Sequence, residues 1–276
     1  MNKNITTIII GKRSFLSKNL IMKIPNSKIF SINEILKKKN FKLKYKIINI
    51  IYNHSYPLSK LNLSIDYNEI INQNILCLCK FLKFILKNEL KIKTFIFSSS
   101  AAVYNLEENK KNFNFFDNNR NLYGASKFLA ERLLIAQKKQ LNYNIVIMRI
   151  FNIFGPNENR SLIGKIINLK EKRKKINVYS NQKSFRDFIH INDVVEIYKK
   201  FLTRKESGIY DVGSGISTNI KKLIDSFFKK NDQKILKNIN FDEQRYSKAN
   251  LKKLQASIGK ISFINVNKFL NDELNS

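Results

Sequence analysis

A serine cluster and a tyrosine–lysine pair are the side chains of this sequence best suited to acid–base chemistry. Ser98-Ser99-Ser100 closes an apolar segment that starts at Thr94, and Tyr123 and Lys127 follow in a helical segment. Tyr123 and Lys127 are spaced i, i+4, so on a helix both side chains leave the same face. An ammonium beside a phenol favours the phenolate and lowers the pKa of the tyrosine. Such a tyrosine can exchange a proton with a sugar hydroxyl, while a serine from the neighbouring strand bonds the same oxygen.

The elements that must position these side chains alternate between strands and helices. Apolar, β-branched runs predict strands, and apolar periodicity near 3.6 residues predicts helices. The predicted strands are residues 5–10, 28–32, 46–52, 94–104 and 143–148. The predicted helices start near residue 15 and residue 121 or cover residues 67–87, 162–176 and 219–229, the last one capped by Ser217 or Thr218.

The turn after the first strand has the chemistry of a phosphate site. A strand, a tight turn at Gly11 and a helix from about Phe15 form the phosphate-binding start of a Rossmann unit. Exposed N–H groups and the helix dipole favour an anion at such a position. By itself this turn is equally compatible with an ordinary connection between a strand and a helix.

Three further motifs agree with one family. They are the serine cluster continued as Ala101-Ala102-Val103-Tyr104, the segment from Arg149 to Pro156 with the pattern R-x-x-N-x-F-G-P, and the segment Arg186-Asp187-Phe188-Ile189-His190. Together with Tyr-Gly-Ala-Ser-Lys at 123–127, they resemble the extended short-chain dehydrogenase/reductase family, in its NAD-dependent epimerase/dehydratase group acting on nucleotide sugars. The resemblance implies an α/β fold, a Rossmann-type doubly wound parallel sheet with a smaller C-terminal α/β substrate domain. The expected domains are 1–155, rejoined by about 186–205, for the dinucleotide and 156–185 with 206–276 for the substrate.

The resemblance also implies a role for each matching residue. Ser100, Tyr123 and Lys127 are the expected catalytic residues, and Lys127 also bonds the nicotinamide ribose. The expected residues at the NAD or NADP cofactor are Gly11, Arg13, Ser14, Phe15, Leu16, Ser17, Ser98, Tyr123 and Lys127. The expected residues at the nucleotide sugar are Ser100, Asn152, Arg186 and Arg245. Asn74 resembles the structural asparagine of the family, and Asp193 is expected to cap the helix that follows it.

The sequence departs from the family at the cofactor. Ser14 and Ser17 stand where the family pattern GxxGxxG has glycine, and a positive φ at either position would cost more with serine. Residues 49–52 stand where relatives place a His-Leu-Ala-Ala-like stretch that lines the cofactor. Ser31 and Asn33 lie where an acidic residue would bind the adenine ribose of NAD. Arg13 is a possible partner for a 2′-phosphate, so the choice between NAD and NADP stays open.

The activity that follows is an epimerase acting through a 4-keto intermediate, with Tyr123 as acid and base. Relatives that remove water carry an Asp-Glu pair after the serine cluster, whereas this chain has Ala101-Ala102. One alternative is an NADP-dependent nucleotide-sugar 4-ketoreductase, favoured by Arg13. Another is a weakly active or non-catalytic cofactor-binding protein, suggested by the altered turn.

Composition bounds the remaining classes. The chain has 276 residues, 51 basic and 21 acidic residues, and a formal charge of +30. The basic residues are spread along the chain without zinc-ligand spacing or an RNA-binding motif, so nucleic acid and metal are not expected as partners. Cys77 and Cys79 indicate core residues of a reducing compartment, and without a signal peptide or membrane span a cytoplasmic protein is expected. Helices near 67–87 and 121 are those that relatives pair in a dimeric four-helix bundle, so a homodimer is expected.

Overall fold

Apolar strands form the sheet that organises the first part of the chain. The computed structural model describes residues 5–38, 41, 47–56, 67–104, 119–137, 142–172, 176–178, 184–227, 236–238 and 246–275. The six-stranded sheet has the order β2-β1-β3-β4-β5-β9, and the pairs from β2 to β4 are parallel. The strands are β1 (Ile5–Ile10), β2 (Ser27–Phe30), β3 (Ile47–Tyr52), β4 (Ile92–Ser100), β5 (Asn144–Ile150) and β9 (Gly208–Val212).

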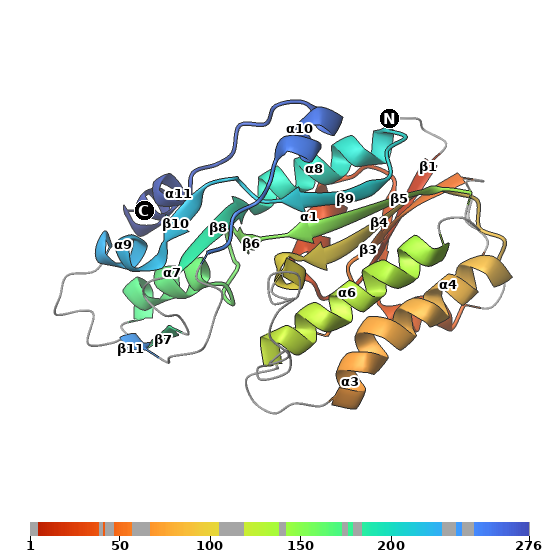
Figure 1. Cartoon of the computed structure of the whole chain (residues 1–276), viewed down its shortest axis with the longest axis horizontal. Helices are drawn as coiled ribbons and strands as arrows, with labels where there is room; N and C mark the ends of the chain where they lie inside the picture. The colour runs from red at the N-terminus through yellow and green to blue at the C-terminus, as the bar shows by residue number, and fades with distance from the viewer. Residues whose placement is uncertain are drawn as a thin grey trace, which may run out of the picture. The chain divides into compact units, whose positions relative to one another are not determined.

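Helices pack on both faces of this sheet, as side-chain alternation along the strands requires. Tyr52 and Phe97 lie in the apolar core shared with α4, whereas the next residues, Asn53 and Ser98, bond α1 and α8. In Figure 1, α4 and α6 run side by side along one face. The helices of this part are α1 (Phe15–Lys23), α2 (Ile32–Leu36), α3 (Tyr67–Ile71), α4 (Cys77–Lys87), α6 (Asn119–Gln137) and α8 (Ile191–Thr203).

The core between the sheet and α4 is aromatic and aliphatic. The ring of Tyr52 lies 5.5 Å from that of Phe81 and 6.1 Å from that of Phe97, measured between centroids. Each such side chain stabilises the fold by about 1.5–3 kcal/mol relative to an exposed one. This core fixes the carboxyl ends of β3 and β4, where the polar residues of the site begin.

By its internal contacts the chain divides into two units. The first unit comprises Met1–Arg149 with Ile197–Tyr210, and the second Ile150–Glu196 with Asp211–Ser276. The second unit contains the sheets β10-β8-β6 and β11-β7. Its elements are β6 (Asn152–Phe154), α7 (Leu162–Lys172), β7 (Ile176–Val178), β8 (Phe185–His190), β10 (Ser217–Asn219), α9 (Ile220–Asp225), β11 (Leu236–Asn238), α10 (Lys252–Ile258) and α11 (Val266–Asn275).

A buried carboxylate holds the second unit together around β8. Asp187 accepts hydrogen bonds from the backbone and hydroxyl of Ser214 and from the backbone N–H groups of Gly215 and Ala249. Burial raises the pKa of Asp187, and these hydrogen bonds oppose that rise. Asp187 therefore links three separate segments of the chain through hydrogen bonds. A buried charged group is expected to have such partners, because burying it without them is costly.

The doubly wound α/β fold predicted from the sequence is confirmed, while several local details differ. The predicted helix over 67–87 contains a π-helical turn, Asn72–Leu76, between α3 and α4. The cap of α9 is Asn219 rather than Ser217 or Thr218, since its side chain accepts from the backbone of Lys222. Asp193 lies inside α8 and accepts from the backbone of Ile264, so it is not a cap.

The main segment of the first unit ends at Arg149, and the chain returns to this unit at Ile197. The sequence places the end of the dinucleotide domain at residue 155 and the return at about residue 186. In the described part of the chain, no helix is both long and apolar enough to cross a bilayer.

Candidate active site

Ser100 and Tyr123 meet at the carboxyl end of β4. Ser100 is the last residue of the strand, and its hydroxyl accepts from the backbone N–H of Ala102 over 3.2 Å, which caps a short 3₁₀ turn, Ala101–Val103. Tyr123 lies in the first half of α6, and its side chain is hydrogen-bonded to Ser100 and to Ser55. The structure therefore brings together the serine and tyrosine that the sequence predicts as partners.

The small residues around Tyr123 allow this approach. A Cβ built at Gly124 would lie 2.4 Å from the carbonyl oxygen of Ala102, so only glycine lets α6 come so close to the 3₁₀ turn. Ala102 therefore has a packing role against α6, in addition to its place where some relatives carry an acidic residue. This contact sets the distance between β4 and the residue that follows Tyr123.

Lys127 is buried, but its ammonium contacts a carbonyl rather than the phenol. Its Nζ donates to the backbone oxygen of Ser98 over 2.9 Å and lies 5.9 Å from the centroid of the Tyr123 ring. Burial lowers the pKa of Lys127 to about 8, and the charge of Glu131 opposes this shift. Lys127 thus keeps a charge near neutral pH inside the core.

The structure does not show the lowering of the Tyr123 pKa by Lys127 that the sequence predicts. Burial raises the pKa of Tyr123, and only the hydrogen bonds with Ser55 and Ser100 oppose that rise. Desolvation disfavours the phenolate, and the ammonium of Lys127 is bonded to the carbonyl of Ser98. Tyr123 is therefore a neutral phenol at neutral pH.

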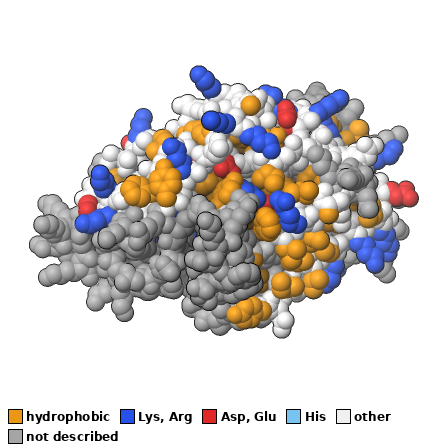
Figure 2. Space-filling model, in the orientation of Figure 1, with side chains coloured by type: hydrophobic (Ala, Val, Ile, Leu, Met, Phe, Trp, Pro, Cys, Tyr) orange, Lys and Arg blue, Asp and Glu red, His pale blue; other side chains and the backbone are white. Residues whose placement is uncertain are grey.

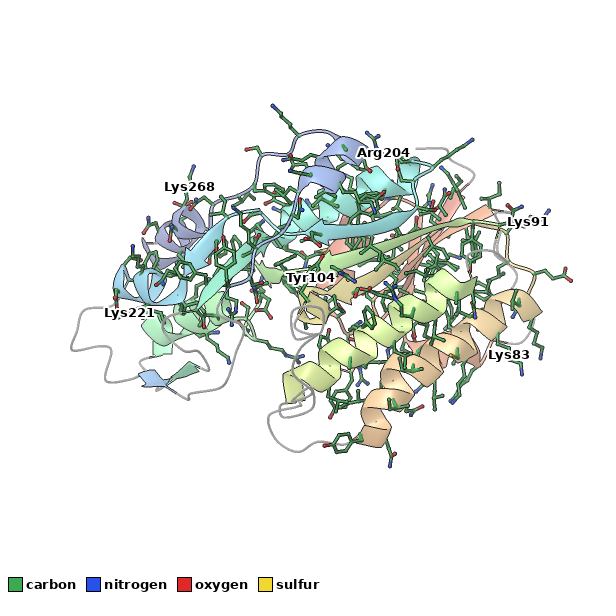
Figure 3. All side chains as sticks on the ribbon, in the orientation of Figure 1. Lys83, Lys91, Tyr104, Arg204, Lys221 and Lys268 are labelled. Carbon is green, nitrogen blue, oxygen red and sulfur yellow. The ribbon has the colours of Figure 1, made fainter. Side chains whose placement is uncertain are left out.

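A buried ion pair lies behind the end of β4. The side chain of Arg149 donates from Nε and Nη2 to the two carboxylate oxygens of Glu131, over 3.1 and 2.9 Å. Ser99 donates to the same carboxylate over 2.5 Å, and the guanidinium lies 4.6 Å from the centroid of the Tyr104 ring. Figure 3 labels Tyr104 close to the end of β4. The pair connects α6, β4 and β5 just behind Ser100.

Asn74, in the π-helical turn, fixes the backbone of α6 next to Tyr123. Its side-chain oxygen accepts from the backbone N–H of Tyr56 over 2.7 Å, and its amide donates to the hydroxyl of Ser126, also over 2.7 Å. Ser126 in turn donates to the carbonyl of Tyr123. π-Helical turns are often found at functional sites because they re-aim one side chain, and here that side chain joins the segment after β3 to the Tyr123 turn.

The predicted phosphate turn lies at the switch point of the sheet. β1 is paired with β2 on one side and β3 on the other, so the chain reverses its direction of winding between β1 and β3. Ligands of open α/β sheets bind in the crevice at the carboxyl ends of such strands. Gly11 has φ +115, and a Cβ there would meet the backbone of Asn53 and His54 at 2.9 Å. A glycine is therefore required at this position.

The two serines of the turn fit the backbone without strain. Ser14 has φ −69 and ψ 138 and is the N-cap of α1, its side chain accepting from the backbone N–H of Ser17 over 3.4 Å. Ser17 lies inside α1 and is buried. Neither position needs a positive φ, so the expected cost of replacing glycine does not arise. Phe15 and Leu16 open the helix, where N–H groups have no partner within the helix.

The residues that line the switch point from β3 are not those expected from the sequence. Residues 49–52 belong to the buried part of β3, and Tyr52 is a core side chain. Asn53, His54 and Ser55 follow the strand and lie against Gly11 or Tyr123 instead. The sequence signal that identifies them is the first run of polar residues after the apolar strand.

The end of β2 carries a salt bridge close to the turn. Ser31 and Glu34 form a capping box at the start of α2, which lowers the pKa of Glu34. The ammonium of Lys12 lies 3.1 Å from the carboxylate of Glu34. Arg13 is exposed on the same turn. Lys12 and Arg13 therefore both lie at the position where the sequence suggests a contact to the 2′-phosphate of NADP.

Of the residues expected at the nucleotide sugar, Ser100 lies in the first unit, and Asn152 and Arg186 lie in the second. The amide of Asn152 donates to the backbone oxygen of Asp187 over 2.8 Å, which joins β6 to β8. Arg186 donates from Nη1 to the backbone oxygen of Phe185. Arg245 lies outside the described residues. Among the residues that the structure describes, no group of three His, Cys, Asp or Glu side chains is arranged to hold a metal ion.

Comparison with known proteins identifies the family. A model of the NAD dependent epimerase/dehydratase family matches residues 37–213, more than half of the chain. The chain therefore belongs to this family, and the family predicted from its motifs is confirmed, as is the expectation of an enzyme of this class.

Similar curated proteins include an epimerase and a dehydratase. The chain is 27% identical to the ADP-L-glycero-D-manno-heptose-6-epimerase of Brachyspira hyodysenteriae, with 94% of each chain covered. It is 29% identical to a dTDP-D-glucose 4,6-dehydratase of Dictyostelium discoideum, with 77% of this chain and 53% of that protein covered.

Solved structures share the fold over nearly the whole chain. The UDP-glucuronic acid 4-epimerase of Bacillus cereus, in complex with UDP-glucuronic acid and NAD, aligns with a TM-score of 0.77 at 17% identity and covers 98% of both chains. RMD from Pseudomonas aeruginosa, complexed with NADPH, aligns with a TM-score of 0.72 at 18% identity, covering 98% of this chain and 100% of that one.

Proposed function

We propose that this chain is an NAD(P)-dependent nucleotide-sugar epimerase that acts through a 4-keto intermediate, with Tyr123 as the acid and base. The observation that carries the proposal is the hydrogen bond between Tyr123 and Ser100, with the buried Lys127 one helical turn further on. Membership of the family and the names of its relatives support a reaction on a nucleotide sugar. The small pair Ala101-Ala102 supports epimerisation over loss of water.

The first unit fits a nicotinamide dinucleotide. Gly11 admits only a hydrogen against the backbone after β3, which keeps the turn tight, and the N-terminus of α1 follows directly. Backbone N–H groups of Phe15 and Leu16 would hold the pyrophosphate. The cofactor, when bound, supplies the hydride acceptor and donor that the chain itself lacks.

Tyr123 and Ser100 would carry out the proton transfer to and from the sugar hydroxyl. Ser100 holds a sugar hydroxyl, and Tyr123 exchanges that proton at its phenolic oxygen. Because burial raises the pKa of Tyr123, the tyrosine needs positive charge in the occupied site before it can act as a base. Lys127 contributes one such charge, fixed by the carbonyl of Ser98.

The second unit would bind the nucleotide. Asn152 and Arg186 come from the neighbouring strands β6 and β8. A guanidinium fork matches paired phosphate oxygens and stays charged at any relevant pH. Asn152, Arg186 and Arg245 are therefore our proposed contacts to the substrate.

A second candidate is an NADP-dependent 4-ketoreductase. The two cations on the turn after β1, which faces the end of β2, favour it. Lys12 and Arg13 lie on the cofactor turn, and Ser31 stands where an acidic residue would select NAD. A reductase would transfer the hydride of NADPH to a 4-keto sugar, with a proton to the carbonyl oxygen, and release the alcohol and the oxidised cofactor. A non-catalytic cofactor-binding protein would bind the dinucleotide and convert nothing.

We also propose a homodimer through α4 and α6. Leu86 on α4 and Leu129 on α6 are 66% and 46% exposed, and so are, in part, Ile135 on α6 and Leu76 at the end of the π-helical turn before α4. Figure 2 shows hydrophobic side chains gathered on the face where these helices lie in Figure 1. An exposed apolar face on two neighbouring helices is typical of an association surface.

The test is a substrate panel with a product assay. The purified chain is incubated with ADP-, UDP-, dTDP- and GDP-sugars, with NAD⁺ or NADPH, and the products are resolved by NMR. An epimerised sugar without net change in the cofactor supports the proposal, and Tyr123→Phe must abolish it while the fold is intact. Stoichiometric oxidation of NADPH with a 4-keto sugar identifies the reductase. Dinucleotide binding without product from any sugar identifies the non-catalytic protein, and an unsaturated or dehydrated product excludes the epimerase.

A further inference from the structure

Asn53 contacts both ends of the cofactor turn from the other side of the switch point. Its backbone N–H donates to the carbonyl of Ile10 over 2.8 Å. Its carbonyl carbon would meet a Cβ on Gly11 at 2.9 Å, so the two backbones touch. Its side-chain amide donates to the hydroxyl of Ser17 over 2.9 Å. One residue therefore fixes the turn where it leaves β1 and again in the first turn of α1.

The same side chain reaches the catalytic strand. The side-chain oxygen of Asn53 accepts a hydrogen bond from the hydroxyl of Ser98. That hydroxyl also lies 2.7 Å from the hydroxyl of the buried Tyr198 on α8, and the carbonyl of Ser98 holds Lys127. Asn53 thus joins the phosphate turn to the residue that fixes the catalytic lysine.

Ser17 stands where the family pattern has its third glycine. That glycine serves close packing of the helix against the strand, and Ser17 satisfies the same need because it is fully buried in α1. Its hydroxyl adds a hydrogen-bond acceptor that glycine lacks. Without this acceptor, a donor of the partly buried Asn53 amide would lose its partner, which is costly.

We propose that Asn53 is the residue that positions the cofactor turn relative to the catalytic strand, and that Ser17 is its obligatory partner. This chain therefore needs a serine at position 17, because a glycine there would remove the hydrogen bond that holds the Asn53 side chain. The inference rests on the proposed function only in naming the turn as the place where a dinucleotide binds. The hydrogen-bond chain itself is a property of the free protein.

The test compares Ser17→Gly with a control at the other end of α1. Ser17→Gly breaks the bond to Asn53, whereas Ser27→Ala removes a hydroxyl that donates to the carbonyl of Ile24 over 2.6 Å, just after α1 ends. We expect Ser17→Gly to weaken binding of NAD⁺ and NADP⁺ about threefold to tenfold, and Ser27→Ala to change it less than twofold. In the cofactor-free protein, Ser17→Gly should also speed amide hydrogen exchange at residues 53–56 and 97–100, and Ser27→Ala should leave both segments unchanged.

Two additions keep the test decisive. In an Asn53→Ala background, Ser17→Gly should have no further effect on exchange or binding, because the bond is already lost. Ser17→Ala, which keeps a Cβ for the helix, replaces Ser17→Gly if the latter fails to fold. Tighter or unchanged dinucleotide binding by Ser17→Gly, with unchanged exchange at 97–100, would overturn the proposal. If the wild-type chain binds neither dinucleotide, the proposed function fails, and the exchange data alone decide the role of Asn53.

Discussion

Arg149 donates two hydrogen bonds to the carboxylate of Glu131 inside the first unit, and both side chains are almost completely buried. Arg149 is the first residue of the motif R-x-x-N-x-F-G-P, and the sequence alone suggests no role for it. Its hydrogen bonds to Glu131 indicate a structural role. Net burial of an ion pair seldom stabilises a fold by itself. Its position behind Ser99 and one turn beyond Lys127 indicates that the pair serves to hold β4 and α6 in register.

Removing one partner of this pair should destabilise the protein strongly. Arg149→Leu leaves the carboxylate of Glu131 buried without its main partner, so we expect the free energy of unfolding to fall by about 3–5 kcal/mol. Urea denaturation of the two proteins measures the difference. Arg132→Leu is the matched control, since Arg132 lies 4.0 Å from the same carboxylate but is 47% exposed, and such a contact contributes less than about 1 kcal/mol. Equal losses for the two arginines would contradict the assigned role.

Glu131 should also control the pH range of activity through Lys127. Burial lowers the pKa of Lys127 to about 8, and Glu131 opposes this. If turnover needs the ammonium, activity falls as the pH rises through about 8, and Glu131→Gln moves this decline to lower pH. Profiles of kcat/KM against pH for both proteins check the shift, with Asp225→Asn, an exposed carboxylate in the second unit, as the control. If the decline of activity at high pH does not move in Glu131→Gln, Lys127 is not the group that causes it.

The same shift predicts how stability depends on pH. The pKa of Lys127 is lower in the folded chain than in the unfolded chain, so the unfolded chain binds more protons between about 8 and 10.5. The stability of the wild type should therefore rise, relative to Lys127→Met, as the pH increases through this window. Denaturation of both proteins across that range measures the difference, and a constant difference would mean that Lys127 titrates normally.

Tyr123 should titrate above an ordinary tyrosine in the ligand-free protein. Burial raises its pKa, and the hydrogen bonds from Ser55 and Ser100 oppose the rise. The absorbance difference between wild type and Tyr123→Phe isolates this group, and Ser100→Ala should move its titration to still higher pH. Turnover by Tyr123→Phe should fall by about 10²–10⁴-fold, the range for loss of a general acid–base. A phenol that titrates below its usual range without ligand would restore the assignment to Lys127 made from the sequence.

Sequence predicts those parts of the site that depend on local spacing. The strand that carries Ser100, the helix that carries Tyr123 and the glycine that β1 needs are all visible as periodicity or as a residue type that one backbone geometry requires, although the predicted strand runs on to residue 104 where the structure has a 3₁₀ turn after Ser100. Asn53 was missed because its role depends on where β3 ends, and an apolar run does not mark its last residue sharply. Placing the lining residues at 49–52 put them within the core, on the strand itself.

Long-range contacts and burial account for the rest. The bond from Lys127 to the carbonyl of Ser98 and the pair of Glu131 with Arg149 join segments whose proximity is fixed only by the packed sheet. The pKa of Tyr123 depends on how completely the phenol is desolvated, which spacing cannot give. Ser14 and Ser17 show the same limit in the opposite direction, because their backbone angles make the expected strain disappear.

Association through α4 and α6 should depend on both apolar contacts and salt. Leu129→Glu places a charge on the exposed apolar face of α6, so we expect it to convert a wild-type dimer to a monomer in sedimentation experiments. Lys80, Lys83 and Lys87 lie on the exposed side of α4, and Figure 3 shows Lys83 pointing outward. Because these like charges oppose association, the dimer should strengthen as added salt screens them. Met22→Glu, at a side chain 69% exposed on α1, is the control and should leave the dimer unchanged. A wild-type chain that stays monomeric at every protein and salt concentration would remove this interface.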